Sequence, residues 1–380
     1  MGEISMKYTY FNNAADANPL APGVIEAVTK AMQEQPQVSS GNAPATPDNL
    51  YQCRTRLAQL LGVNTAQTVL TSGTTCGLNA ALLGLELKPG DLVIASVMEH
   101  YSVLRSLAML EEQCGVRVEY VPLNAYAKLD MKAYAKLLSE KPRLVVLAHA
   151  SNVTGRINPV RSWFDWAKFV GAYTLLDASQ TAGRIPVIAD ELLADMVVFP
   201  GYKGLRGPLG TGGLYIGHEI TQKPVSAEGK GAQRDKRTQP EELPIRLEPG
   251  TPNSPAYAGL RAALCYYAEH ASEIFAKEVM IMERLLTGLL RIPNIRVFDK
   301  DPLDRLPVIS FSINGVDADT AGLALADDYG IECRTGPRSA PLMHKALGTK
   351  GMIKLSMSYR NNIDCIDYML DAVKAVARAS

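Results

Sequence analysis

One lysine, Lys203, lies in a glycine-rich stretch that directly follows a short apolar run at residues 196–199. Glycine carries no Cβ, so such a stretch can turn sharply and bring the lysine close to another group. A lysine amine forms an imine with an aldehyde when desolvation or a neighbouring cation lowers its pKa. Taken alone, the stretch is more typical of a surface turn with a solvated lysine, so the other polar residues decide its interpretation.

Polar residues also follow four other apolar runs of the chain. They are residues 71–75 after the run 68–70, 99–102 after 92–95, 149–152 after 144–148, and 177–180 after 173–176. Ligands of open α/β sheets bind outside the carboxyl ends of the strands. We therefore expect these residues and Lys203 to meet at one edge of one sheet.

These strand-end residues suit different parts of one ligand. Thr74 and Thr75 after Gly73 suit a phosphate at a helix N-terminus, although such residues are also ordinary helix caps. Asp177 at the end of an apolar run needs a donor such as a pyridinium N–H, unless it simply caps a helix. His100 can lie flat on an aromatic ring, or be an ordinary hydrogen-bonded histidine. Phosphate, aromatic ring, ring nitrogen and aldehyde together describe pyridoxal 5′-phosphate (PLP).

Composition and charge exclude several other classes of protein. The chain has 380 residues, and 47% of them are hydrophobic. Its formal net charge is zero, so it lacks the excess of basic residues that is typical of proteins that bind nucleic acids or membrane surfaces. No apolar run approaches the length of a membrane span. The six cysteines are scattered, without C-x-x-C pairs or histidines at metal-ligand spacing. We predict a cytoplasmic protein that binds no nucleic acid, membrane or metal.

The elements that must position the site alternate along the first two thirds of the chain. Helical periodicity follows Pro22, covers Asn49–Leu61 and recurs at residues 131–140 behind Asp130. Apolar runs typical of buried strands alternate with such stretches and predict a mostly parallel sheet covered on both faces. These runs are residues 68–70, 92–95, 116–121, 144–148, 173–176, 196–199 and 213–216.

From about Ala256 the pattern changes. Helical periodicity covers residues 259–270 and 272–290, strand-like segments follow at 308–313 and 352–357, and a last helix is expected at 363–379. This pattern indicates a smaller α+β domain. We predict an α/β protein with a seven-stranded large domain over residues 18–254, and a small domain formed by residues 1–17 and 255–380.

Six motifs that occur in order carry a resemblance to a known family: TSGTT, EHYS, HASNVTGRINPV, DASQTAG, GYKGLRGPLGTGGLYIG and EPGTPN. Together they resemble the cysteine desulfurase and selenocysteine lyase group of class V aminotransferases, over nearly the whole chain. The resemblance implies a PLP-dependent transferase of fold type I. It also implies a homodimer whose active sites lie at the subunit interface.

The same resemblance implies roles for individual residues. Lys203 corresponds to the Schiff-base lysine and proton shuttle, His100 to the residue that stacks on the cofactor ring, and Asp177 to the partner of the pyridine nitrogen. The remaining cofactor-binding roles fall on Thr74 and Thr75 (phosphate), Gln180 (phenolic oxygen), Asn152 (orientation of cofactor and substrate) and Thr251 (phosphate of the partner subunit).

One departure from the family pattern concerns the sulfur chemistry. In the desulfurases a loop carries a cysteine that attacks the substrate sulfur, and a histidine precedes it. This chain has Ser339 and Arg338 at those positions. A serine hydroxyl cannot form a persulfide, because its pKa is far above that of a thiol. Two alternatives to a natural loss of the sulfur nucleophile are considered. Ser339 is an engineered replacement of a cysteine, or nearby Cys333 acts as the nucleophile instead.

Further departures concern the binding groups. Lys354 replaces the arginine that grips the substrate carboxylate in the family, so the two-pronged geometry is lost. Tyr202 replaces a histidine before Lys203 and can offer its phenol to the phosphate. Four cations lie in the loops of the small domain. They predict either an amino substrate with more negative charge than cysteine or a substrate carboxylate that is bound in a different pose. The alternative is that they are solvated surface residues. The four cations are Arg334, Arg338, Lys354 and Arg360.

Three functions remain open at this point. The first is a PLP-dependent lyase that cleaves a C–S or C–Se bond of a cysteine-like amino acid by β-elimination. The second is another PLP reaction, by an aminotransferase, epimerase or decarboxylase acting on an anionic amino substrate, or by a true desulfurase that uses another cysteine. The third is a non-enzymatic partner subunit, which has no physical need for Lys203.

Overall fold

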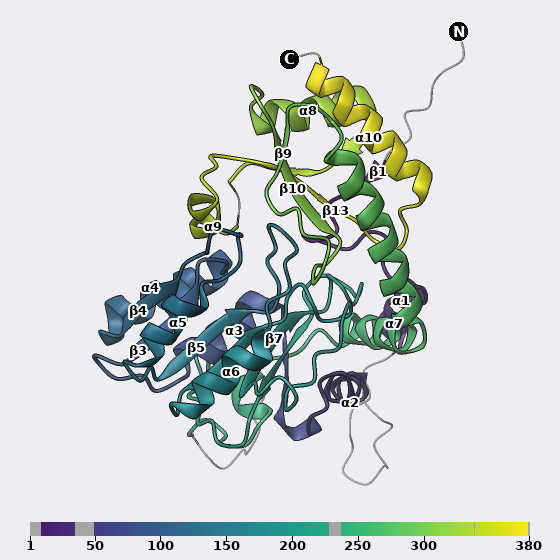
Figure 1. The fold of residues 1–380 in the computed structure, drawn as a ribbon. Helices are drawn as coiled ribbons and strands as arrows, with labels where there is room; N and C mark the ends of the chain where they lie inside the picture. The colour runs from purple at the N-terminus through teal and green to yellow at the C-terminus, as the bar shows by residue number, and fades with distance from the viewer. Residues whose placement is uncertain (1–8, 35–48, 228–236, 338, 379–380) are drawn as a thin grey trace.

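A sheet of seven strands lies at the centre of the larger part of the molecule, in a computed structural model that describes residues 9–34, 49–227, 237–337 and 339–378 (Figure 1). Strand β8 runs antiparallel to both of its neighbours, and the other neighbouring strands pair in parallel. The predicted mostly parallel seven-stranded sheet is thus confirmed. In spatial order the strands are β2 (Thr68–Thr71), β8 (Gly212–Ile216), β7 (Met196–Pro200), β6 (Tyr173–Asp177), β5 (Leu144–Ala148), β3 (Leu92–Ser96) and β4 (Arg117–Val121).

Helices cover both faces of this sheet, which explains why its strands are apolar throughout. Val93 packs in one core cluster with α3 (Thr74–Leu83) and α4 (Tyr101–Cys114). Its neighbour Ile94 belongs to a second cluster on the opposite face, because successive side chains of a strand alternate. That second cluster includes residues of α2 (Asn49–Leu61), α5 (Met131–Leu138) and α6 (Val160–Phe169).

A smaller antiparallel sheet forms the core of the C-terminal part. Its strands, in spatial order, are β12 (Arg334–Thr335), β13 (Ile353–Ser356), β10 (Val308–Ile313) and β9 (Ile295–Val297). The N-terminal segment joins this part, because β1 (Thr9–Tyr10) pairs in parallel with β11 (Ile331–Glu332). Figure 1 shows β1 among the elements of the C-terminal part. The residue boundaries of the two domains stay a prediction. The accompanying helices are α8 (Ala318–Tyr329), α9 (Pro341–Ala346) and α10 (Ile363–Arg378).

The long helix α7 (Ser254–Leu289) connects the two parts and corrects one prediction. Two helical stretches, 259–270 and 272–290, were expected, but the structure has one helix of 36 residues. No glycine or proline separates the two stretches, so nothing interrupts the backbone hydrogen bonds between them. Helix α7 packs against α1 (Val24–Gln33) and α2 near its start and against α10 further along (Figure 1).

Two short 3-10 helices, η1 (Thr65–Gln67) and η2 (Ile245–Leu247), complete the elements of the described ranges. Within those ranges, no helix combines the length and the apolar character that crossing a membrane would require.

Candidate active site

A cavity of about 230 Å³ lies at the carboxyl edge of the large sheet, where the C-terminal part meets it. Thr251 does not line this cavity, and Arg338 lies outside the described residues. The other predicted site residues all line it: Thr74, Thr75, His100, Asn152, Asp177, Gln180, Tyr202, Lys203, Arg334, Ser339 and Lys354. Residues separated by up to 280 positions along the chain therefore meet in one place.

The start of α3 offers a site for an anion. The helix begins after Gly73, whose φ of 138° favours glycine, and the free N–H groups of its first turn carry the positive end of the helix dipole. The Thr74 hydroxyl lies 2.9 Å from the hydroxyl of Ser179. The Tyr202 ring packs on Gly73, where a Cβ would lie 3.4 Å from it. Two hydroxyls, a phenol and a helix N-terminus thus surround one corner of the cavity.

Asp177 combines the two roles considered for it. It is the last residue of β6, it is buried, and its Oδ1 accepts a hydrogen bond from the backbone N–H of Ser179 at 2.8 Å. This bond orders the turn after the strand, as a capping aspartate would. None of the hydrogen bonds between described residues uses Oδ2, so that oxygen is available to a donor in the cavity.

His100 is held as a neutral imidazole. It caps α4, where its Nδ1 accepts a hydrogen bond from the backbone N–H of Ser102 at 3.1 Å. An accepting Nδ1 carries no proton, so the ring proton belongs on Nε2. Burial and then the nearby Lys203 ammonium lower the pKa of His100, against the opposing effect of Asp177. The ring is therefore uncharged and fixed in orientation.

The two lysines of the cavity both have depressed pKa values. Burial lowers the pKa of Lys203, although the carboxylates of Asp177 and Asp16 oppose this effect. Burial, together with the charges of Lys203 and Arg334, lowers the pKa of Lys354 to about 7. The Lys354 ammonium donates a hydrogen bond to the backbone oxygen of Asn152 at 3.2 Å.

Glu99 is a buried carboxyl group between the lining residues Met98 and His100. It is fully buried, and its Oε1 accepts hydrogen bonds from the Ser96 hydroxyl at 2.5 Å and the Ala148 N–H at 3.0 Å. Burial raises the pKa of this carboxyl to about 8, and the negative charge of Asp177 adds to the effect. Glu99 is therefore mostly protonated at pH 7, so the negative charge at the cavity comes from Asp177 and Asp16 rather than from Glu99.

The donor set of the cavity fits PLP. The α3 N-terminus suits the phosphate, the free oxygen of Asp177 suits a protonated ring nitrogen, and the Lys203 amine suits the aldehyde. Gln180 adds an independent observation. Its Nε2 donates to the Ala14 oxygen at 3.1 Å, while its buried Oε1 has no partner among the described residues. A phenolic hydroxyl would satisfy that oxygen.

The loop that carries Ser339 closes one side of the cavity. Ser339 has a φ of 79°, and its backbone oxygen accepts a hydrogen bond from the Tyr101 N–H at 2.8 Å, which places the loop between α9 and the start of α4 (Figure 1). No cysteine belongs to the described cavity lining. Cys333 lies outside it, and burial raises the pKa of its thiol to about 12, so it is protonated.

Some residues of the site were missed or misjudged from the sequence. Asp16, Ser102 and Ser179 line the cavity although no role was assigned to them from the sequence, and only Ser102 and Ser179 belong to the polar segments expected at this edge. Asp16 belongs to none of the six motifs, so none of them signalled its place in the cavity. Arg360 is exposed, lies outside the lining and has its guanidinium 5.7 Å from the ring centre of Tyr359. No group of three or more metal-ligating side chains occurs in the described part of the chain.

Fold and cavity together define the class of PLP-dependent transferases of fold type I. The family model "Aminotransferase class-V" matches residues 9–369, and the chain therefore belongs to this family. The family, the fold class and the PLP cofactor predicted from the sequence are thereby confirmed. That Ser339 stands at the position of the persulfide cysteine stays a prediction.

Known relatives narrow the class to cysteine desulfurase-like enzymes. A cysteine desulfurase of Pectobacterium atrosepticum is 31% identical over 335 residues, which are 86% of this chain and 81% of the relative. The structure of a cysteine desulfurase from Thermococcus onnurineus has 28% identity and a TM-score of 0.91, over 98% of this chain and 95% of that one. The cystine C–S lyase C-DES, at 24% identity and a TM-score of 0.82 over 97% of both chains, shares the fold.

Proposed function

We propose that this enzyme cleaves the C–S bond, or the analogous C–Se bond, of a cysteine-like amino acid by β-elimination, without a persulfide on the protein. The observation that carries this proposal is the composition of the cavity wall. Ser339 lines the cavity, no described lining residue is a cysteine, and the thiol of Cys333 is protonated outside it. Sulfur transfer to the protein needs a thiolate at the substrate sulfur.

The catalytic roles we propose are those of Lys203 and His100. Bound PLP would withdraw electrons from the substrate Cα. Lys203 would hold the aldehyde of the cofactor and then accept the proton of Cα, for which its lowered pKa suits it. The neutral His100 ring would lie against the cofactor ring. Cofactor binding would use Thr74, Thr75, Asn152, Asp177, Gln180 and Tyr202, and substrate binding Asn152, Arg334, Ser339 and Lys354.

The proposed reaction balances without an external oxidant or reductant. The proton of Cα passes to Lys203, the Cβ–S bond breaks, and the sulfur leaves with its electron pair. Hydrolysis of the released unsaturated amine then gives pyruvate and ammonia. L-cysteine would yield hydrogen sulfide, and L-cystine would yield cysteine persulfide, which is also the reaction product named for C-DES. The ratio of pyruvate to alanine formed from these two substrates tests the proposal.

Lys354 makes substrate affinity depend on pH in this account. Its pKa of about 7 means that it loses its charge as the pH rises above 7, and a neutral amine no longer attracts the substrate carboxylate. We expect kcat/KM for L-cysteine to fall above pH 7 in the wild type. The arginine of Lys354→Arg stays charged throughout this pH range, so kcat/KM of this variant should not fall above pH 7. Kinetics of both proteins between pH 6 and pH 9 check this, and parallel profiles would contradict it.

We also propose that the enzyme is a homodimer, as its family resemblance implies. Exposed apolar side chains lie on elements around the start of α7: Ile25 (66% exposed), Met32, Tyr51, Leu209 and Ile245. Such a cluster favours an interface with a second copy. The loop of residues 248–253 lies nearby. Glu248 anchors it to Arg54 and to the Leu70 N–H, which leaves Thr251 exposed for the partner's phosphate.

Sedimentation equilibrium tests the dimer. We expect twice the chain mass for the wild type and a shift towards the single chain mass for Ile25→Glu, because the substitution puts a charge into the interface. Phe169 on α6 is 92% exposed and lies outside the proposed surface, so Phe169→Glu is the matched control and should remain dimeric. A monomeric wild type would contradict the proposal.

A further inference from the structure

The loop of residues 151–158 brings together the two parts of the molecule at the cavity. It follows β5, and its residue Asn152 lines the cavity. The backbone oxygen of Asn152 accepts the hydrogen bond from the Lys354 ammonium, at 3.2 Å. Lys354 comes from β13 of the C-terminal part. This hydrogen bond therefore ties the Lys354 ammonium to the loop.

Arg156 closes this loop through its backbone. The Ser151 N–H donates to the Arg156 oxygen at 2.9 Å, and the Gly155 N–H donates to the Ser151 oxygen at 2.9 Å. At Gly155, whose φ is 80°, an added Cβ would lie 2.7 Å from the backbone oxygen of Val308. The loop backbone thus packs directly against the start of β10.

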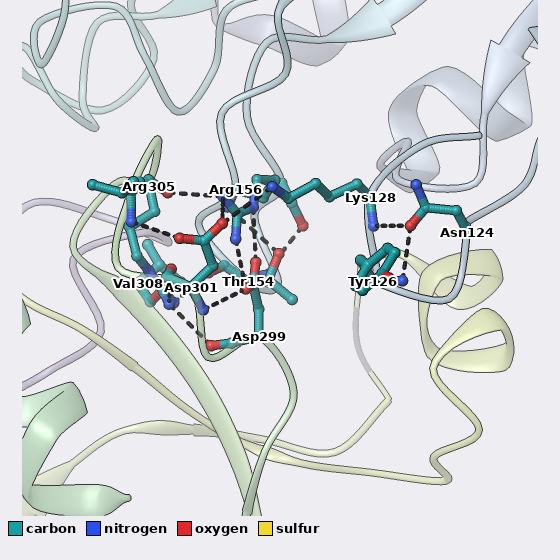
Figure 2. Close-up of polar contacts among 11 residues, drawn as sticks. Asn124, Tyr126, Lys128, Thr154, Arg156, Asp299, Asp301, Arg305 and Val308 are labelled. Atoms are coloured by element: carbon teal, nitrogen blue, oxygen red, sulfur yellow. Dashed lines mark hydrogen bonds and ion pairs between the residues drawn. The ribbon is translucent and has the colours of Figure 1, made fainter. Parts of the chain in front are cut away.

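The side chain of Arg156 extends from the loop into the C-terminal part and is 3% exposed. Its Nε and Nη2 donate to the two carboxylate oxygens of Asp299 at 2.9 and 2.6 Å. Its Nη1 donates to Asp301 Oδ2 at 3.2 Å and to the Leu303 oxygen at 2.8 Å. Figure 2 shows these contacts around Arg156. A two-pronged pair of this kind defines orientation as well as distance.

Arg305 makes the reciprocal connection from the C-terminal part to the loop. Its Nη2 donates to the Thr154 oxygen and to the Val308 oxygen, both at 2.7 Å, and its Nη1 donates to the Asp299 oxygen at 3.0 Å (Figure 2). The Ser310 hydroxyl also donates to the Val153 oxygen at 2.5 Å. The Leu306 N–H donates to the Gly155 oxygen at 2.8 Å. The loop is therefore held through three of its backbone oxygens as well as through Arg156.

We call Arg156, Asp299, Asp301 and Arg305 the Arg156 network. It contains two guanidinium groups and two carboxylates, so its charges balance, and Arg156, Asp299 and Arg305 are buried. Water cannot easily replace a buried partner, so losing one leaves an unpaired charge in the interior. One arrangement of the loop is consequently favoured over others. Lys128 touches only the rim of the network, with its Nζ 3.1 Å from Asp301 Oδ2.

We propose that Arg156 is a positioning residue for substrate binding. By holding the loop of residues 151–158 on the C-terminal part, it sets the position of the Asn152 backbone oxygen and thereby of the Lys354 ammonium that meets the substrate carboxylate. This inference rests on the proposed function for the carboxylate contact. Apart from Asn152, the residues proposed above to bind the cofactor lie on other loops, so we expect Arg156 to affect substrate binding more than cofactor binding.

Hydrogen exchange tests the effect on the loop without any cofactor or substrate. In Arg156→Met, the amides of residues 151–158 should exchange at least about tenfold faster than in the wild type, because their acceptors are no longer held in place. Lys128→Met breaks only the rim contact with Asp301 and should leave this exchange unchanged. If Arg156→Met does not fold, Arg156→Lys, which keeps the charge but loses the two-pronged geometry, provides the same test.

Steady-state kinetics and cofactor titration then separate positioning from general stability. We expect Arg156→Met, or Arg156→Lys in its place, to raise KM for L-cysteine about tenfold while kcat changes less than about threefold, since the carboxylate contact is the same throughout the reaction. Affinity for PLP should stay within about threefold of the wild type. Lys128→Met should match the wild type in all three quantities.

Unchanged loop exchange, or an unchanged KM with a mobile loop, would overturn the inference. A parallel loss of PLP affinity, kcat and KM would also overturn it, because a purely structural role predicts that pattern. The wild type provides the separate test of the proposed function. If it turns over no cysteine-like amino acid, the proposed function fails, whereas the exchange experiment still decides whether Arg156 orders the loop.

Discussion

Lys203→Ala is expected to lower the turnover of a cysteine-like substrate by at least about 1,000-fold, because both the covalent hold on the cofactor and the acceptor of the Cα proton disappear. The structure supports such an effect. Lys203 is half-buried in the cavity wall, and desolvation lowers its pKa towards the range in which an amine acts as a base, although the charge of Asp177 opposes this effect. Lys354 lies in the same cavity but is held by the Asn152 oxygen, so it cannot simply take over.

The same variant has a spectroscopic signature. The absorption that a covalent lysine link gives to bound PLP should be absent. The start of α3 around Thr74 should still bind the phosphate of the cofactor. Lys223→Ala is a suitable control, since Lys223 is exposed and pairs with Glu86 far from the cavity. A Lys203→Ala protein that kept both the absorption and more than about a tenth of the activity would contradict the role of Lys203.

Asp177→Asn should have the second largest effect, a fall in kcat of about 100-fold or more. A carboxylate at this position favours the protonated ring nitrogen, whereas an amide does not, so the cofactor becomes a weaker acceptor of electrons. The fold should persist, because the Asn oxygen can still accept the hydrogen bond that the Ser179 N–H now donates to Oδ1.

Stopped-assay rates and thermal unfolding of Asp177→Asn together test this. We expect an unfolding temperature close to that of the wild type with the large loss of kcat. Asp165→Asn on the exposed face of α6 removes a carboxylate without touching the cavity, and it should retain full activity. Equal kcat values for Asp177→Asn and the wild type would show that the ring nitrogen has another partner.

Much of the fold could be predicted because the strands of a doubly covered sheet are apolar on both faces. Val93 and Ile94, for example, point to opposite sides and are both fully buried. The position of the site followed from the same pattern, since polar residues such as Asp177 directly follow these strands and meet at one edge. Local patterns therefore placed these polar residues at one edge of the sheet, whereas the roles assigned to them stay predictions.

Features that depend on long-range contacts could not be predicted in this way. The pair of Arg156 and Asp299 joins residues 143 positions apart, and neither residue shows a local signal for the other. The continuity of α7 was missed for a different reason, because two similar helical patterns do not reveal whether the residues between them also stay helical. Asp16 reaches the cavity through long-range contacts of the N-terminal segment, which pairs with the C-terminal part at β1 and donates from the Ala17 N–H to the Tyr202 oxygen at 3.0 Å.

The central claim is that the C–S bond breaks by elimination rather than by transfer of sulfur to a protein thiol. The product ratio from L-cysteine under reducing conditions, and from L-cystine under non-reducing conditions, tests it most directly. The account predicts pyruvate and ammonia in equal amounts with little alanine, and unchanged products for Ser339→Ala. Alanine as the main product would contradict it, because alanine forms only when a nucleophile removes the sulfur.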